Sequence, residues 1–211
     1  MYAEDFLTSP LMVSYEPVLR QAVKDDAAQI ALVRTSQDPL TYEWYPRERV
    51  HLDTDLQNLG TTVYWINLGM TSMNASLDAR ILDTVGLATP LAARMPRDPD
   101  GRVGHDKQLS AEWQVADTAV DLHQLPEWID EEKARQARAA LRTPEIAELL
   151  ASSREPMSRE RFLANIRYSI GPGRSLMLDD DPTRYLSPTT LGQLRRGADM
   201  GLKTNGNQIA W

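Results

Sequence analysis

Three histidines, each with a nearby aspartate, are the residues whose spacing comes closest to a reactive site: His51 with Asp53, His105 with Asp106, and His123 with Asp121. Residues two apart on a strand share a face, so an imidazole and a carboxylate can bind one metal or form a base with its orienting partner. A catalytic zinc commonly needs three such ligands and an open position. The pairs fall in different expected elements and no HExxH spacing occurs, which favours solvent-exposed polar pairs.

The acidic and glycine-rich stretches fit no ligand loop. In "RDPDGRVGHDK", a calcium loop with Gly101 sixth would have Pro96 first and Lys107 twelfth, where an acid is needed. Consecutive acids in "LDDDPTRY" (178–185) point in different directions, as in a solvated turn, and "GPGR" (171–174) has too few glycines for a phosphate loop. No GxSxG motif occurs either. We therefore predict no catalytic residue, no metal, no cofactor and a protein that is not an enzyme.

Bulk composition is that of an ordinary globular protein. The 211 residues are 42% hydrophobic and 25% charged, enough for a real core and most simply one domain. The net charge of −7 disfavours nucleic-acid binding through a global positive field, and the absence of cysteine removes disulfides and thiolate sites. The acidic start "MYAEDFLTSPLMV" does not fit a signal peptide, and no apolar run approaches a membrane span. These features predict a soluble product made in a reducing cytoplasm and not secreted.

Both ends of the chain are expected to be arms. Residues 1–14 carry apolar side chains without a clean period, including Phe6 and Leu11, and water tolerates such side chains poorly on a free tail. Residues 171–211 are rich in Gly, Pro, Asp and Asn and end on Trp211. We predict that Phe6, Leu11 and Trp211 dock on this or another subunit.

Between the arms, hydrophobic periodicity and turn residues predict the following elements: a helix at 15–36, strands within 40–68, a short helix at 76–86 closed by Gly86, an exposed loop at 89–111 and a strand at 112–122. Three helices follow, which start at Pro126, at the Thr143–Pro144 pair and after Ser158. In the last of them Phe162, Leu163, Ile166 and Ile170 share one face. A further short helix is expected at 188–196.

The predicted fold class is α+β, mostly α. A single domain at 15–170 forms a helical bundle with a small inserted antiparallel β part at about 40–122, with an extended N-terminal arm (1–14) and C-terminal tail (171–211).

The helix in "QLPEWIDEEKARQARAALRTPE" (124–145) has acids in its first half and Arg135, Arg138 and Arg142 in its second, as the helix dipole favours. A stripe of small alanines permits close approach of a neighbouring helix. Two interpretations stay open. The arginines complement their own helix in a bundle, or they form a basic stripe that faces a partner.

The order of features at residues 113–170 resembles the tail-adaptor (tubular tail protein A) family of short-tailed bacteriophages. The similar text is "AVDLHQLPEWIDEEKARQARAALRTPEIAELLASSREPMSRERFLANI", with "TYEWYPRERVHLD" upstream. The resemblance implies a ring of subunits between the portal and the tail nozzle. The chain departs from the family pattern at its N-terminus, where the nearest phrase, "ILDTVGLATP" (81–90), comes after the first strands, and in its C-terminal tail.

The function predicted from these features is a structural virion protein, a head-to-tail connector located in the phage neck. Its partners would be other copies of itself in a ring, the portal protein and other tail proteins, with no sequence-specific nucleic-acid binding but a place in the wall of a DNA channel. The alternatives are a small cytoplasmic metal-dependent or hydrolytic enzyme and a regulatory helical binding module.

Overall fold

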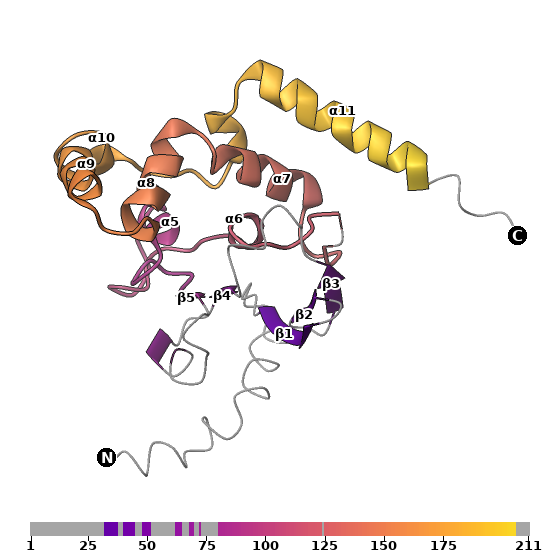
Figure 1. The fold of residues 1–211 in the computed structure, drawn as a ribbon, viewed down its shortest axis with the longest axis horizontal. Coiled ribbons are helices and arrows are strands. Elements are labelled where there is room, and N and C mark those ends of the chain that lie inside the picture. The colour runs from indigo at the N-terminus through magenta and orange to yellow at the C-terminus, as the bar shows by residue number, and fades with distance from the viewer. Residues whose placement is uncertain are drawn as a thin grey trace, which may run out of the picture.

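The computed structural model describes residues 32–37, 40–44, 48–51, 62–64, 68–69, 72, 80–123 and 125–205. The strands come first: β1 (Leu32–Gln37), β2 (Leu40–Trp44), β3 (Glu48–His51), β4 (Thr62–Tyr64) and β5 (Arg80–Leu82). The helices follow: α5 (Pro90–Ala93), α6 (Ala111–Ala116), α7 (Glu131–Ala140), α8 (Pro144–Arg154), α9 (Arg159–Ile170), α10 (Pro172–Ser175), the 3-10 helix η2 (Pro182–Tyr185) and α11 (Pro188–Asn205). Figure 1 shows α8, α9 and α10 gathered at one end, with the sheet of β1, β2 and β3 apart from them.

The strands form two small sheets. β1, β2 and β3 pair antiparallel in that order, with a register shift between Arg34 and Ser36. β4 pairs with β5 in parallel, with Val63 opposite Ile81. β2, β3 and β4 lie within 40–68, where the sequence predicts strands, whereas β1 occupies the end of the helix predicted at 15–36, whose residues 15–31 lie outside the described part.

Two further predictions of local structure were wrong. Residues 112–116 of the predicted strand 112–122 belong to helix α6 (Ala111–Ala116), because Trp113, Gln114 and Val115 are all buried and the helix has no exposed polar face to give a 3.6-residue period. In the helix predicted at 76–86, residues 80–82 form β5 and the chain then bends. Gly86 does adopt a positive φ of 90°, but in this bend and not at a helix end.

The later helices begin where their capping residues predict. Thr143 occupies the N-cap of α8 with Pro144 after it, and the Ser158 hydroxyl accepts from the Arg161 N–H at 3.0 Å in α9. The helix expected from Pro126 starts later, at Glu131, because Asp130 caps it by accepting from the Lys133 N–H at 2.9 Å. The 18-residue α11 is longer than the helix expected at 188–196. Among the described residues no helix is long and apolar enough to cross a bilayer.

The core lies between α5, α6, α7 and α8. Its largest fully buried side chains include Trp113, Tyr64, Leu91, Leu109 and Ile146. Leu91 and Leu109 belong to the stretch 89–111, so this stretch is not the wholly exposed loop that was predicted. Its turn-rich middle is on the surface, but both of its ends are packed into the core.

Candidate functional site

Asp83 directly follows β5 and has no exposed surface. Its two carboxylate oxygens accept from five backbone N–H groups, those of Val85, Gly86, Leu87, Ala88 and Thr89. Burial by itself would raise the pKa of Asp83, but the backbone N–H bonds outweigh burial and hold this pKa below its ordinary value. The carboxylate is therefore a structural anchor for the bend, and it is poorly suited to accept a proton from a substrate.

A second buried carboxylate, Asp117, collects three partners at one oxygen. Its Oδ2 accepts from the Tyr64 hydroxyl at 2.7 Å, from Arg80 Nη2 at 3.0 Å and from Arg154 Nη2 at 2.6 Å. Burial, followed by the charge of Asp117, raises the pKa of Tyr64 well above its ordinary value, so the phenol stays protonated. This group, the Asp117 cluster, joins β4, β5 and α8 to the end of α6.

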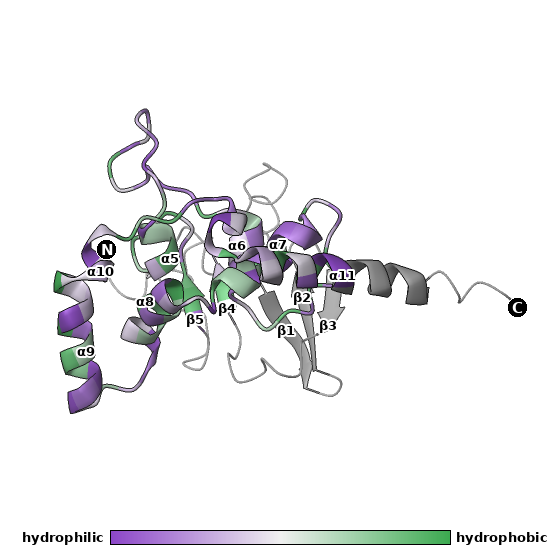
Figure 2. Cartoon of the chain, turned by 90° about the horizontal axis from the view of Figure 1, so that it is seen from above, coloured by the Kyte–Doolittle hydropathy of each residue, from purple (hydrophilic) through white to green (hydrophobic). Residues whose placement is uncertain are grey.

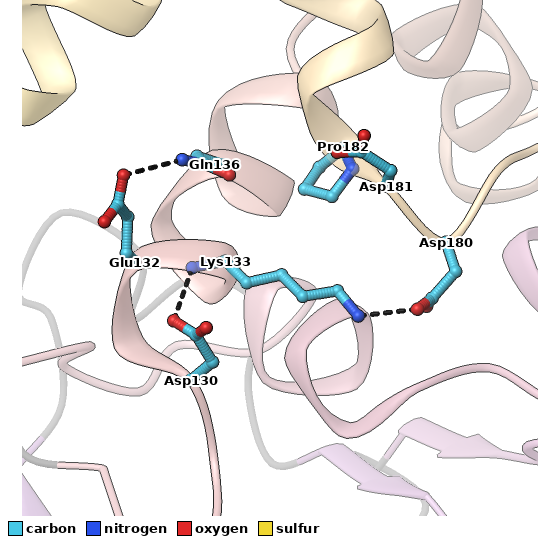
Figure 3. Close-up of a pocket in the computed structure, with 7 residues that line it drawn as sticks. All are labelled: Asp130, Glu132, Lys133, Gln136, Asp180, Asp181 and Pro182. Carbon is cyan, nitrogen blue, oxygen red and sulfur yellow. Dashed lines mark hydrogen bonds and ion pairs between the residues drawn. The ribbon is translucent and has the colours of Figure 1, made fainter.

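An open pocket of about 320 Å³ lies between the start of α7 and the segment that leads into η2. All but one of its lining residues have polar or charged side chains: Asp130, Glu132, Lys133, Gln136, Asp180, Asp181 and Pro182. We call it the α7–η2 pocket (Figure 3).

The core fixes the two walls of the α7–η2 pocket. The indole N–H of Trp113, in α6, donates to the Asp180 carbonyl at 3.2 Å, and its ring meets that of Tyr185 edge-on at 6.1 Å. On the other wall Lys133 extends across the pocket to Asp180, with its Nζ 2.6 Å from Oδ2 (Figure 3). The pocket is thus assembled from segments 47 residues apart in the sequence.

The polar groups of this pocket suit a neutral, hydroxyl-rich ligand. Asp130 and Asp180 each use one carboxylate oxygen in the bonds given above, which leaves the other oxygen to accept from a hydroxyl. Burial acts to lower the pKa of Lys133, but Asp180 and Glu112 outweigh it and raise this pKa, so the amine stays a cationic donor. The Gln136 amide donates to Glu132 at 3.0 Å.

The two histidine pairs that the structure describes, at 105–106 and 121–123, do not come together as a metal site; Asp53 and the side chain of His51 lie outside the described residues. His105 is exposed, whereas its neighbour Asp106 is buried and pairs with Arg97. The His123 ring contacts Glu131 through Nδ1 at 3.1 Å, and the His123 backbone N–H donates to the Asp121 carboxylate. In the part of the chain that the structure describes, no three metal-ligating side chains converge.

Arg135 and Arg138 of α7 and Arg142, two residues beyond its end, have different surroundings. Arg138 donates to the carbonyls of Val115, Ala116, Thr118 and Val120 and so ties α7 to the end of α6. Arg135 lies 3.6 Å from Glu131 on its own helix, and Arg142 is exposed. That this stripe faces a partner stays a prediction.

The other predicted partner-binding residues, Phe6, Leu11 and Trp211, lie outside the described residues.

The chain has relatives of known name. The family model described as the AftB family C-terminal domain matches residues 8–188. The chain belongs to this family. The terminal beta-(1->2)-arabinofuranosyltransferase of Corynebacterium glutamicum is 49% identical over 189 residues, which cover 88% of this chain and 28% of that enzyme. The enzyme of the same name from Mycobacterium tuberculosis is 41% identical over 109 residues, which cover 51% of this chain and 17% of that enzyme. No solved structure matches the chain.

AftB-family membership overturns the phage hypothesis. The resemblance to tail adaptors, the virion location, the ring with portal and tail-nozzle partners, and the prediction of a protein that is not an enzyme were all wrong. Of the two alternatives, the enzyme fits the family better. The misleading motifs, such as the "TPE" (143–145) at the start of α8, are common helix-start signals, so they carry no information about function.

Sequence reasoning missed both the Asp117 cluster and the α7–η2 pocket. Asp180 belongs to the acidic run 178–185, which was interpreted as a solvated turn, and Lys133 was one of several charges on a helix. The available signal for Asp83 was its position three residues before Gly86, since an aspartate at the start of a turn can accept from the backbone N–H groups that follow it.

Proposed function

We propose that this chain is an acceptor-binding part of a terminal β-(1→2)-arabinofuranosyltransferase, and that its α7–η2 pocket holds the arabinofuranose units of the acceptor. The chain spans 28% and 17% of the lengths of the two relatives. The reaction named by these relatives joins C1 of an arabinofuranose to a 2-hydroxyl, so it needs a site that presents the acceptor hydroxyl and a base that takes its proton.

The proposal rests on a difference between two kinds of carboxylate: buried ones that already accept several hydrogen bonds, and pocket ones with an oxygen left to accept from a ligand. Asp83 and Asp117 are buried and already bonded to several donors, and neither is placed to act as the base. The α7–η2 pocket instead presents carboxylates, an ammonium and an amide at an open surface. Sugar rings are bound by such mixed donors and acceptors, because each hydroxyl both donates and accepts.

A partly exposed tryptophan supports the same ligand class. Trp128 is 44% exposed and precedes Asp130 by two residues. Indole surfaces pack against the C–H faces of sugar rings while the rim of the site forms hydrogen bonds. We place Trp128 at the edge of the bound oligosaccharide.

The test is titration of the purified chain with a short arabinofuranosyl oligosaccharide, followed by NMR and by tryptophan fluorescence. Asp180→Asn should weaken binding by about tenfold, since it removes a charged hydrogen-bond acceptor. Asp100→Asn makes the same charge change on an exposed turn outside the pocket and should leave binding unchanged. If the unmodified chain shows no saturable shifts, or if both variants bind equally, the pocket is not the acceptor site.

A further inference from the structure

Helix α9 packs on the protein through its polar side. Arg161 is buried and pairs with Glu148 and, at 3.1 Å, with Glu155. The Asn165 amide donates to the Ser152 carbonyl of α8 at 2.9 Å, and Tyr168 is 7% exposed.

The apolar side of α9 faces outward. Phe162, Leu163, Ile166 and Ile170 are 53%, 43%, 43% and 75% exposed. At 3.6 residues per turn they span a sector of about 100° on the side opposite Arg161 and Tyr168. A surface helix of a globular protein normally has the reverse orientation, with its apolar stripe toward the core. We call these four residues the α9 stripe.

Tight packing holds this reversed orientation in place. A Cβ on Gly173, in α10, would clash with the Tyr168 ring, so α10 closes directly over the inward side of α9. Rolling the helix to bury the α9 stripe would expose Tyr168 and pull Arg161 from both of its carboxylates. Figure 2 shows α9 at the outer edge of the molecule, with hydrophobic residues (green) alternating with hydrophilic ones (purple) along its ribbon.

Arginines border the α9 stripe in an otherwise acidic chain. Arg159 and Arg167 are exposed on α9, and Arg174 is exposed just beyond it, whereas Glu160 is the exposed acid of this helix. The whole chain has a net charge of −7. A short helix with Phe, Leu and Ile outward and arginines beside them is typical of a helix that lies in the plane of a membrane interface.

We propose that the α9 stripe docks on a lipid surface with anionic headgroups, with the four apolar side chains among the acyl chains and the arginines at the headgroup phosphates. The arginine border decides between the candidate partners, because a second copy of this acidic chain offers no matching excess of negative charge at its own stripe. This docking is separate from the α7–η2 pocket and does not depend on its ligand.

The test is co-sedimentation of the purified chain with vesicles of phosphatidylglycerol and of phosphatidylcholine. We expect binding to phosphatidylglycerol vesicles and weaker binding to phosphatidylcholine. Phe162→Ser with Ile166→Ser should lower partitioning by about tenfold or more. Arg159→Glu and Arg167→Glu should each lower it by at least about fivefold on phosphatidylglycerol.

The matched control is Leu87→Ser with Val103→Ser, which removes two apolar side chains that are 58% and 85% exposed elsewhere. This pair should bind vesicles as the unmodified chain does. Absence of sedimentation with phosphatidylglycerol, or equal loss in both double variants, would overturn the proposal. A dimer in light scattering that dissociates only in the variant Phe162→Ser with Ile166→Ser would also overturn the proposal, because the α9 stripe would then pack against a second copy of the chain.

Discussion

The Asp117 cluster and the α7–η2 pocket are built from the same kinds of group but differ in what those groups can do. In the Asp117 cluster the carboxylate is buried and one oxygen accepts from three side-chain donors. In the α7–η2 pocket Lys133 bridges two carboxylates at the surface, with side chains that remain partly exposed. A charged group is available for a ligand only where its neighbours leave part of it unsatisfied, so the same residue types stabilise the fold in one region and form a candidate binding site in the other.

The largest expected effect on stability comes from replacing Asp83, whose carboxylate accepts from five backbone N–H groups. Asp83→Ala should lower the free energy of unfolding by about 4 kcal/mol, because several buried backbone N–H groups lose their acceptor. Asp83→Asn, which keeps one acceptor oxygen, should cost roughly half as much. Chemical denaturation measures both. The control is Asp98→Ala, where an exposed carboxylate accepts from the Asp100 N–H, and it should cost under about 1 kcal/mol.

The Asp117 cluster should come next. Asp117→Ala should lower the free energy of unfolding by about 3 kcal/mol, since it leaves the buried Tyr64 hydroxyl without its hydrogen-bond acceptor. Arg80 and Arg154 are 23% and 28% exposed and can turn to water, which limits the loss. Adding Tyr64→Phe to Asp117→Ala should recover part of the stability in a double-mutant cycle. Strict additivity of the two changes would show that the tyrosine bond contributes little.

Acid should reduce the contribution of Asp83 to stability. The pKa of Asp83 is lower in the folded protein than its ordinary value of 3.8, so its contribution to stability is present above pH 3.8 and is lost as the pH falls through the lower folded value. The free energy of unfolding, measured by denaturation between about pH 5 and pH 2, should therefore fall. Asp83→Asn should make that decline shallower. An unchanged slope in the variant would mean that Asp83 does not titrate differently in the two states.

The smallest effect on stability should come from the pocket. Lys133→Ala should change the free energy of unfolding by at most about 1 kcal/mol, because the amine and Asp180 are both partly exposed to solvent. Oligosaccharide binding should nevertheless weaken, as measured by NMR titration. A loss of stability as large as that of Asp117→Ala would place Lys133 among the structural groups and remove the contrast between the two regions.

Local rules in the sequence determined where the late helices begin. Ser158 marks the first turn of α9 because its hydroxyl accepts from a free N–H group, and Pro144 marks that of α8 because its ring fixes a helical φ where no N–H partner is needed. The same patterns grouped the four apolar residues of the α9 stripe on one face. They also misled, since helix-start motifs occur in unrelated families and were taken as a sign of phage adaptors.

Only the tertiary structure decided which way those faces point and which charges meet. Helix α6 is buried except at the partly exposed Glu112, so its sequence has no amphipathic period. The α9 stripe faces outward because Arg161 finds its carboxylates on α8 and after it. Lys133 and Asp180 meet because Trp113 and Tyr185 hold the segment before η2 against the core. Such contacts join residues distant along the chain, and capping and periodicity carry information only over a few neighbouring turns.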